Sequence, residues 1–444
     1  MSKFIINGGI KLKGEISIFG SKNVALKVLV AACLTDEEVT VENVPLISDF
    51  ITMGEIIVHL GGKVVFKDHA VSIRLPKFSS EKISLEKAVE IRTSYMFLAP
   101  LLARMGKAII PNPGGCRIGA RPIDRIVDGL EKMGVEIQYS SKDGYFHAIA
   151  PNGLNGIQYV FAKNTHTGTE TMILAAVLAH GQTILENAAE EPEVDDLIAF
   201  LNQMGAKIVR KNSRTIVIDG VSKLKGTKFR IGPDRNEVVT FAVAAIITGG
   251  DIFVRDISRD GLNEFLDELI KCGGGFEEKD NGIRFFYKGE LTATNVATSF
   301  YPGFMTDWQG PWAILMTKAN GVSTIHETVY ENRFTYVEEL KKMGADIKLY
   351  NPQLINPEEV YNFNIKDDES NFLHAAKITG PTELHNAILN VSDLRAGATL
   401  VLAALAASGE STIFGIEHLD RGYEQFDKRL KNLGAEIKRV VENK

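Results

Sequence analysis

Six segments of this chain are apolar on nearly every side of a helix, and they recur along its whole length. They are residues 25–34, 94–105, 171–180, 238–248, 311–319 and 396–408. A surface helix keeps one polar face, whereas a helix that is apolar all round has to be buried. We therefore predict six buried helices, most of them followed by a short strand-forming run such as residues 181–186.

A second, amphipathic helix follows each apolar one and ends in a repeated phrase of an apolar residue, a glycine and a strand-forming run. The phrases begin at Leu60, Met133, Met204, Cys272, Met343 and Leu433. Glycine fits this place because it can end a helix in the left-handed conformation that other residues resist. The residues after it are typical of a β-hairpin, as in residues 207–218. The pattern predicts six copies of one α/β unit.

The spacing of the phrases locates an insertion. They lie 73, 71, 68, 71 and 90 residues apart, so the last interval is about 20 residues longer than the others. We place the insertion between Tyr350 and Glu383, where an elaborated surface loop is the simplest interpretation.

A longer repeat groups the six units into two domains. Residues 11–14 and 223–226 both read Lys-Leu-Lys-Gly, and 444 residues exceed the size at which one hydrophobic core stops growing. We predict a first domain over residues 22–232 and a second over residues 1–21 plus 233–444. The last unit lacks a closing strand, which residues 3–6 are predicted to supply. A solenoid is the alternative, but solenoid repeats are typically about 20–45 residues long and expose their binding face.

Polar residues stand just before each apolar helix, at residues 20–23, 92–94, 165–170, 234–237, 306–309 and 392–395. Helix N-termini carry unpaired N–H groups and a positive dipole end, which attract phosphate and carboxylate groups. Capping accounts for the hydroxyl and acidic side chains. It does not account for Lys22, Arg92, Arg235 and Arg395, because cations are disfavoured there. Since an anion or a carboxylate can neutralise such a cation, these four residues indicate a site for an anionic substrate.

Residues 111–122 are predicted to form a loop, because their prolines and glycines exclude a helix or a central strand. The loop carries Cys116 together with Arg117 and Arg121. Neighbouring cations lower the pKa of a thiol and make it more reactive. Cys116 is therefore either a reactive thiol or an incidental loop cysteine. Two other charged clusters, residues 327–333 and 418–424, are interpreted as ordinary surface ion pairs.

Composition narrows the possible functions. The net charge of -6 argues against a general nucleic-acid surface. No apolar stretch is long enough to cross a bilayer, and the N-terminus lacks a signal-peptide core. The three cysteines lie far apart and cannot all pair, which favours a reducing cytoplasm, with Cys33 and Cys272 as packing residues. The nine histidines show no zinc-type spacing, so no metal is expected.

The polar helix starts and the cysteine loop together resemble the UDP-N-acetylglucosamine 1-carboxyvinyltransferases, a family of enolpyruvyl transferases. The likeness runs from Phe4 to about Arg439 and is carried by residues 20–23, 113–124, 186–193, 233–235, 306–307, 327–333, 393–395 and 420–424. It implies two inside-out α/β domains, each of three repeated units with central buried helices and outer sheets. The helix starts would then face a shared cleft, and residues 111–122 would act as a lid over the substrates.

The reaction implied by this resemblance moves the enolpyruvyl group of phosphoenolpyruvate to the 3'-hydroxyl of UDP-N-acetylglucosamine, the committed step of peptidoglycan synthesis. The hydroxyl adds to C2 while C3 takes a proton, and the tetrahedral intermediate then expels phosphate. By match to the family, Cys116 donates the proton to C3 and Asp307 takes the proton of the sugar hydroxyl. No cofactor, membrane, nucleic acid or obligate protein partner is implied.

The resemblance also implies the binding residues, by match to the family's motifs. Phosphoenolpyruvate is assigned to Lys22, Asn23, Arg121 and Arg421, of which Lys22 and Arg421 also serve catalysis. UDP-N-acetylglucosamine is assigned to Arg92, Arg121, Pro122, Asp124, Lys163, Thr165, Asp307 and Val329. Asp393 and Arg395 are orienting groups at the reacting centre.

Two places depart from the family pattern. Residues 165–169 read Thr-His-Thr-Gly-Thr where Ser-Val-Gly-Ala-Thr is common, which leaves the nucleotide contacts there open, and Arg117 stands where Thr is frequent. The nearest alternative is the sister enzyme acting on shikimate 3-phosphate, which lacks the cysteine loop. An RNA 3'-end cyclase has related repeats, but the acidic balance disfavours it. A catalytically silent UDP-sugar-binding regulator is disfavoured because Cys116, Asp307, Lys22 and Arg421 are intact.

Overall fold

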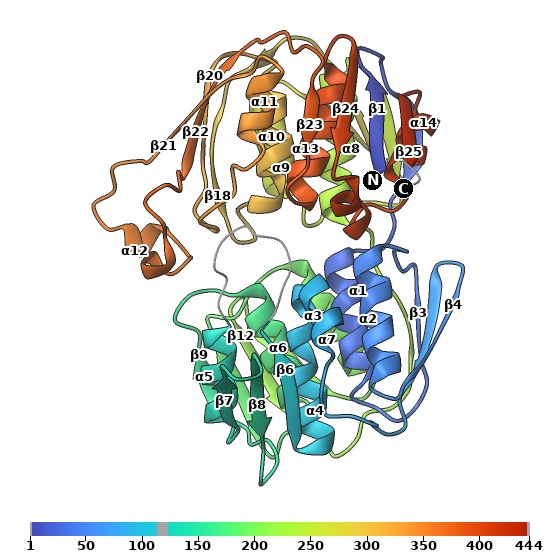
Figure 1. The fold of residues 1–444 in the computed structure, drawn as a ribbon, viewed down its shortest axis with the longest axis vertical. Coiled ribbons are helices and arrows are strands. Elements are labelled where there is room, and N and C mark those ends of the chain that lie inside the picture. Colours follow the sequence, from blue (N-terminus) through green and yellow to red (C-terminus); the bar gives the residue numbers. More distant parts are fainter. Residues whose placement is uncertain (1, 113–122, 442–444) are drawn as a thin grey trace. The chain divides into compact units, whose positions relative to one another are not determined.

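The computed structural model describes residues 2–112 and 123–441, and these divide into two compact units (Figure 1). The N-terminal unit comprises residues 19–112 and 123–232, and the C-terminal unit comprises residues 2–18 and 233–441. The first division therefore falls between Ile18 and Phe19, slightly before the boundary expected from the sequence. Cys116, Arg117, Arg121 and Pro122 of the predicted site lie outside the described residues.

The N-terminal unit has central helices that begin at the predicted polar segments. They are α1 (Lys22–Ala32), η1 (Arg92–Phe97) continued by α4 (Leu98–Met105), and α6 (His166–Ala176). Its other helices are α2 (Ser48–His59), α3 (Leu85–Glu90), α5 (Asp124–Lys132) and α7 (Pro192–Gln203). Its strands are β3 (Val39–Glu42), β4 (Lys63–Lys67), β5 (Ala70–Arg74), β6 (Lys107–Pro111), β7 (Glu136–Ser140), β8 (Tyr145–Ile149), β9 (Gln158–Val160), β10 (Gln182–Glu186), β11 (Lys207–Asn212), β12 (Thr215–Asp219) and β13 (Lys228–Arg230).

The sheets of this unit join its repeats into a ring. Their strand orders are β13-β3-β5-β4, β6-β8-β7 and β11-β12-β10-β9. Strand β13, at the end of the third repeat, runs parallel to β3 of the first repeat. A solenoid leaves its first and last repeats apart. The pairing of β13 with β3 therefore excludes the solenoid alternative.

The C-terminal unit repeats this plan. Its central helices are α8 (Arg235–Ile247), η2 (Thr306–Trp308) continued by α10 (Gln309–Met316), and α13 (Leu394–Ala406). Its other helices are α9 (Asn263–Lys271), α11 (Val337–Lys342), α12 (Pro357–Val360), η3 (Ile365–Asp367), η4 (Ile416–Arg421) and α14 (Phe426–Asn432). Its strands are β1 (Ser2–Asn7), β2 (Lys13–Ser17), β14 (Asp251–Arg255), β15 (Gly275–Lys279), β16 (Gly282–Phe286), β17 (Leu291–Thr292), β18 (Asn295–Ser299), β19 (Phe304–Met305), β20 (Ala319–His326), β21 (Asp346–Tyr350), β22 (Ala375–Gly380), β23 (Ile388–Asn390), β24 (Glu410–Phe414) and β25 (Glu436–Val441).

The N-terminal strand lies within the last sheet of the C-terminal unit, whose order is β23-β24-β1-β25 (Figure 1). Ile5 of β1 stands opposite Thr412 on one side and Lys438 on the other, and both pairings are antiparallel. Phe4 and Ile6 face inward and are fully buried. The first residues of the chain thus occupy the place that the second hairpin strand, such as β12, holds in the other sheets.

Each unit has its own hydrophobic core, built around its central helices. Every residue of α8, from Arg235 to Ile247, is buried. The glycines of the six repeated phrases all have positive φ, between 83° and 99°, so each ends its helix in the left-handed conformation as predicted. Cys33 and Cys272 are both buried in these cores, in agreement with a packing role. No helix of the described ranges is long and apolar enough to span a membrane.

Candidate active site

The starts of α8, α10 and α13 come together in the C-terminal unit, because these three helices pack against one another. Asp307 lies in η2, the short 3₁₀ helix before α10, and Arg395 lies in the first turn of α13. Oδ1 of Asp307 accepts hydrogen bonds from Nε of Arg395 at 2.8 Å and from Nη2 of Arg333 at 3.0 Å. Two of the sequence-predicted residues, Asp307 and Arg395, therefore meet directly.

The two arginines fix the charge of Asp307. Burial by itself raises the pKa of this carboxyl, but the neighbouring guanidinium groups of Arg395 and Arg333 outweigh burial and hold the pKa well below its ordinary range. The side chain of Asp307 keeps 25% of its surface exposed, so it remains accessible to a ligand. Asp307 is thus an ionised, reachable carboxylate at neutral pH.

Arg395 connects this carboxylate to a second helix, α8. Its Nη1 donates to the hydroxyl of Tyr423 at 3.1 Å, and that hydroxyl is 2.8 Å from Oγ1 of Thr240 in α8. Asp393, the residue before α13, caps the helix through Oδ1, which accepts hydrogen bonds from the backbone N–H groups of Arg395 and Ala396. Capping therefore accounts for Asp393, and the cap also fixes the backbone that carries Arg395.

The cluster at residues 327–333 is buried, and its interpretation as surface ion pairs is wrong. The exposed fractions are 0% for Glu327, 2% for Glu331 and 7% for Arg333. Glu327 follows β20, and its Oε1 accepts hydrogen bonds from the backbone N–H groups of Val329 and Tyr330. Burial raises the pKa of Glu327, although Arg333 and these hydrogen bonds oppose the shift. The sequence could not indicate burial here, because charged residues are buried only when tertiary partners exist.

The 418–424 cluster is also partly buried. Arg421 is the last residue of η4 and is half-buried, while Glu424 is 3% exposed. At the start of α8, buried Arg235 donates from Nη1 to the backbone carbonyl of Gly261 at 3.3 Å. The guanidinium of Arg235 also lies over the ring of Tyr301, 5.2 Å from its centroid. Aromatic faces and a carbonyl oxygen thus stabilise this cation at the helix start.

In the N-terminal unit, Lys22 is the first residue of α1, and its Nζ lies 2.8 Å from Oδ2 of Asp49 in α2. Asn23 follows it and is partly buried. Arg92 begins η1 and lies over the ring of Tyr95, 5.9 Å from the centroid. The cations that the sequence placed at helix starts are therefore present there, and a carboxylate neutralises Lys22.

Besides Arg92, the predicted nucleotide-sugar residues described in this unit lie just before α6 and at the start of α5. Oγ1 of Thr165 caps α6 by accepting a hydrogen bond from the N–H of Gly168 at 3.2 Å, and Lys163 is half-buried just before it. Asp124 is the first residue of α5 and is exposed. Thr165 therefore has a capping role in the described structure, as the simpler interpretation held.

Beside Thr165 lies a buried network of charged side chains that was not predicted from the sequence. The carboxylate of Glu170 in α6 lies 3.2 Å from Nζ of Lys27 in α1 and 3.2 Å from Nε2 of His166. The Lys27 and Glu170 side chains are 3% and 0% exposed. The sequence did contain a sign of this network. Lys27 interrupts the apolar segment 25–34, and Glu170 stands four residues after His166, a spacing that places the two on one helix face.

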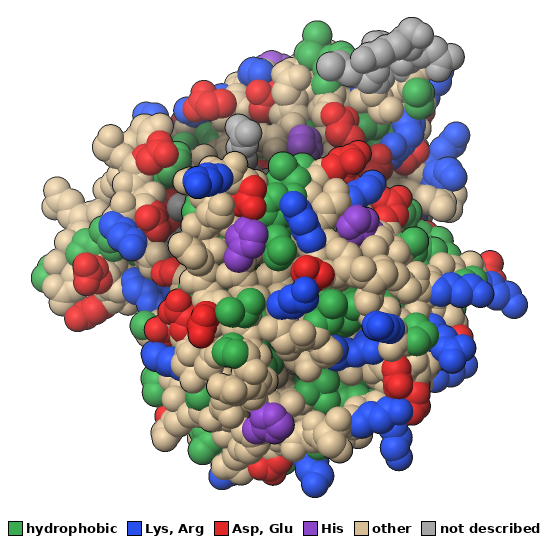
Figure 2. Space-filling view, turned by 60° about the horizontal axis from the view of Figure 1, so that its bottom comes forward, with side chains coloured by type: hydrophobic (Ala, Val, Ile, Leu, Met, Phe, Trp, Pro, Cys, Tyr) green, Lys and Arg blue, Asp and Glu red, His purple; other side chains and the backbone are tan. Residues whose placement is uncertain are grey.

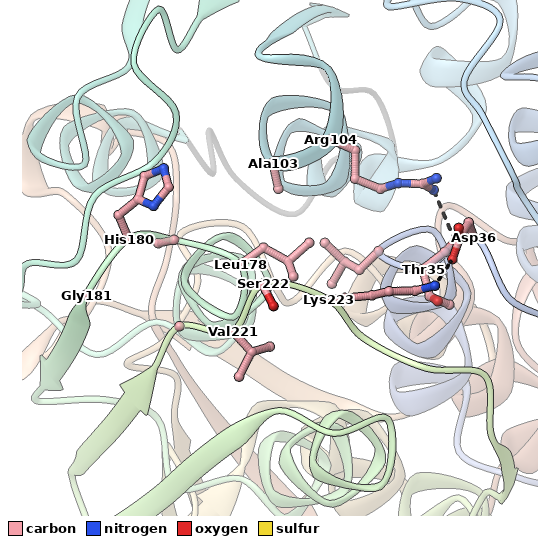
Figure 3. Close-up of a pocket in the computed structure, with 13 residues that line it drawn as sticks. Thr35, Asp36, Ala103, Arg104, Leu178, His180, Gly181, Val221, Ser222 and Lys223 are labelled. Carbon is pink, nitrogen blue, oxygen red and sulfur yellow. Dashed lines mark hydrogen bonds and ion pairs between the residues drawn. The ribbon is translucent and has the colours of Figure 1, made fainter.

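A separate hollow of about 570 Å³ lies at the C-terminal ends of α1, α4 and α6 (Figure 3). Arg104 at its edge donates to four backbone carbonyls, those of Cys33, Thr35, Leu75 and Pro76. Lys223, which also lines the hollow, pairs with Asp36 at 3.1 Å. None of the described site residues predicted from the sequence lines this hollow. Through its hydrogen bonds to Cys33 and Thr35, Arg104 links the C-terminal end of α4 to the residues that follow α1.

Basic and acidic side chains are interspersed over the face of the molecule shown in Figure 2, as the modest net charge leads one to expect. Within residues 2–112 and 123–441, no group of three histidine, cysteine or acidic side chains is arranged to hold a metal ion.

The repeat fold and the charged helix starts define a class of protein. The sequence profile of EPSP synthase (3-phosphoshikimate 1-carboxyvinyltransferase) matches residues 6–430, so the chain belongs to this family of carboxyvinyl transferases. The fold is similar to the enolpyruvyl transferase NikO from Streptomyces tendae, with a TM-score of 0.86 and 23% identity over 100% of this chain and 99% of the other. EPSP synthase from Acinetobacter baumannii gives a TM-score of 0.73 at 19% identity, over 99% and 100% of the two chains. These likenesses confirm the predicted fold class.

Within the family, relatives of higher sequence identity share one particular enzyme name. A UDP-N-acetylglucosamine 1-carboxyvinyltransferase of Koribacter versatilis (strain Ellin345) is 41% identical, over 100% of this chain and 97% of that protein. An enzyme of the same name from Trichlorobacter lovleyi is 40% identical over the full length of both chains. The resemblance inferred from the helix starts and the cysteine loop is thereby confirmed.

Proposed function

We propose that this protein transfers the enolpyruvyl group of phosphoenolpyruvate to the 3'-hydroxyl of UDP-N-acetylglucosamine and releases phosphate. The observation that carries the proposal is Asp307, ionised between Arg333 and Arg395 at the starts of buried helices. One carboxylate beside two guanidinium groups supplies a proton acceptor and anion-binding groups together, which addition and elimination on a phosphorylated acid require. The identity of 40–41% to full-length enzymes of that name supports the same reaction.

The strength of Asp307 as a base depends on its arginines. A carboxylate whose pKa is held this low is a weak proton acceptor, because general-base efficiency rises with basicity. An anionic substrate group that pairs with Arg395 would draw the guanidinium charge away from Asp307 and raise the pKa of this carboxyl. Substrate binding would then make Asp307 competent to take the proton of the sugar hydroxyl.

The other roles follow the family match. Cys116 donates the proton to C3 of phosphoenolpyruvate, while Asn23, Arg121 and Arg421 bind its charged groups together with Lys22. Lys22 can bind substrate while keeping Asp49, because an ammonium group has three donors. The nucleotide sugar is assigned to Arg92, Pro122, Asp124, Lys163, Thr165 and Val329, and Asp393 orients Arg395 through its helix cap.

The proposal extends to the cellular setting. Both partners are small molecules, and the product commits UDP-N-acetylglucosamine to peptidoglycan, which links the protein to cell-wall formation, cell shape and division. We place it in the cytoplasm, where unpaired thiols such as Cys33 and Cys272 stay reduced.

The test is release of inorganic phosphate by the purified protein. We expect release only when phosphoenolpyruvate and UDP-N-acetylglucosamine are both present. Release with shikimate 3-phosphate in place of the nucleotide sugar would establish the sister activity instead. Binding of the nucleotide sugar, measured by calorimetry, without any phosphate release would establish a silent sugar-binding protein and overturn the proposal.

A further inference from the structure

The insertion, residues 351–374, replaces the tight turn of a hairpin. It joins β21 to β22 and carries α12 and η3, whereas residues 213–214 suffice to join β11 to β12 in another repeat. In Figure 1, α12 stands out beyond the end of this hairpin. An insertion at a hairpin turn normally extends into solvent, and the sequence favoured such a surface loop. The insertion is such a loop, since most of its residues are exposed or half-buried, but it also has a few buried side chains.

The insertion has a small aromatic core of its own. The rings of Tyr361 and Phe363 stack with centroids 4.7 Å apart, and the ring of His374 lies 4.9 Å and 5.1 Å from them. All three residues are buried, with exposed fractions of 6%, 6% and 3%. His374 is also held by Asp368, whose Oδ2 lies 3.0 Å from its Nε2. The insertion is therefore an ordered element with a defined inner face.

That inner face packs on the end of β20. The ring of Tyr361 meets His326 edge-on, with centroids 5.6 Å apart, and its hydroxyl is 3.3 Å from Nε2 of His326. The backbone N–H of Asn362 donates to the carbonyl of Thr328 at 2.8 Å. The N–H of Glu327 donates to the carbonyl of His374 at 2.7 Å. The insertion thus holds the chain on both sides of Glu327.

The side chain of Glu327 links the insertion to residues of the candidate active site. Its Oε1 accepts from the N–H groups of Val329 at 2.9 Å and Tyr330 at 3.1 Å. Its Oε2 accepts from Oγ1 of Thr306 at 2.9 Å and Nε2 of Gln309 at 2.8 Å. A fully buried carboxylate with these partners has one position, so the backbone turn at Val329 is fixed by Glu327 and, through it, by the insertion.

We propose that the insertion is a brace that positions Val329 for UDP-N-acetylglucosamine, with Tyr361 as its main positioning residue. This inference rests on the proposed function, because Val329 is assigned to the nucleotide sugar. Asp307 is held separately, by its ion pairs with Arg333 and Arg395. Loosening the brace should therefore weaken binding of the nucleotide sugar more than it slows the chemical step.

The experiment compares Tyr361→Ala with Tyr361→Phe and with Ile355→Ser. Tyr361→Ala should raise KM for UDP-N-acetylglucosamine about tenfold, with kcat and KM for phosphoenolpyruvate within about twofold of wild type. Tyr361→Phe keeps the ring contact with His326 and should restore KM. Ile355 lies in the same insertion but is 98% exposed, so Ile355→Ser should match wild type. If Tyr361→Ala does not fold, Tyr361→Leu keeps apolar volume while removing the ring.

A second measurement separates the brace from the proposed function. Amide hydrogen exchange should show that Val329 and Tyr330 lose protection in Tyr361→Ala and keep it in Ile355→Ser. Retained protection, or an equal rise of KM for both substrates, would overturn the brace. Absence of phosphate release from the wild type would overturn the proposed function instead, and the exchange result would still decide whether the insertion holds this turn.

Discussion

Arg395 Nε donates a hydrogen bond to Oδ1 of Asp307 at 2.8 Å, although 88 residues separate the two in the chain. The pair links the first turn of α13 to the 3₁₀ helix before α10. It joins the proposed base of the reaction to the cation that controls its basicity. The state of this pair, with and without a bound anion, is therefore central to how the site works.

Asp307→Asn should lower phosphate release at least about 100-fold, because the amide cannot accept the proton of the sugar hydroxyl. The amide oxygen can still accept hydrogen bonds from Arg333 and Arg395, so the fold should persist. The matched control is Asp251→Asn, which changes an aspartate that Arg284 binds at 2.8 Å on the sheet of β14. The control should retain wild-type turnover. Near-normal release by Asp307→Asn would remove Asp307 from the role of base.

Thiol labelling should distinguish Cys116 from the other two cysteines. Burial raises the pKa of Cys33 to about 12 and that of Cys272 to about 11, so both stay protonated and enclosed in the folded protein. We expect iodoacetamide at neutral pH to add one group per chain, and Cys116→Ala to add none, by intact mass.

The same variant should nearly abolish turnover and the mass adduct with phosphoenolpyruvate. Labelling after denaturation provides the control, since Cys33 and Cys272 then become reactive in every variant. Labelling of Cys33 or Cys272 in the native protein would contradict the packing role, and full activity of Cys116→Ala would contradict its role as proton donor.

His166 should make stability depend on pH. Burial lowers the pKa of His166, but the carboxylate of Glu170 outweighs burial, so the pKa is raised in the folded protein. The folded protein therefore binds this proton more tightly than the unfolded chain does. The stabilisation is complete below about pH 6.5, the pKa of histidine in the unfolded chain. It is lost as pH rises through the higher pKa that His166 has in the folded protein.

The measurement is the difference in Tm between wild type and His166→Gln. The stabilising contribution of His166 should be larger at pH 6 than at pH 9, because only wild type carries the proton that is lost between them. Lys27 and Glu191 also face this group, with opposite effects on its pKa. A difference in Tm that does not change with pH would show that the proton on His166 does not contribute.

Gly205→Ala should lower the free energy of unfolding by about 1 kcal/mol, because φ at this position is +99° and other residues resist that conformation. A Cβ there would meet no atom within 4 Å, so the cost is conformational and not steric. Gly232 is the matched control, since it has the same open surroundings and an ordinary φ. Urea unfolding should show Gly232→Ala within about 0.5 kcal/mol of wild type, and equal effects of the two substitutions would contradict the left-handed requirement.

The sequence alone was enough for the features that local rules govern. Burial of α8 from Val238 onward follows from the apolar segment 238–248, and the left-handed glycine at Gly205 follows from its place after an amphipathic helix. Both depend on neighbouring residues within a few turns, which the sequence records directly. The roles proposed for Asp307 and Cys116 rest on the family resemblance, not on periodicity.

Tertiary structure alone decided which charges meet. The same rules that placed Arg395 at a helix start could not show that it binds Asp307, that Glu170 joins Lys27 to His166, or that Tyr361 packs on His326. The charged residues of 327–333 were interpreted as surface ion pairs, and nothing in the surface loop 351–374 marked Tyr361, Phe363 and His374 as buried. Such side chains are buried only where partners distant in the chain satisfy them, and the fold brings those partners together.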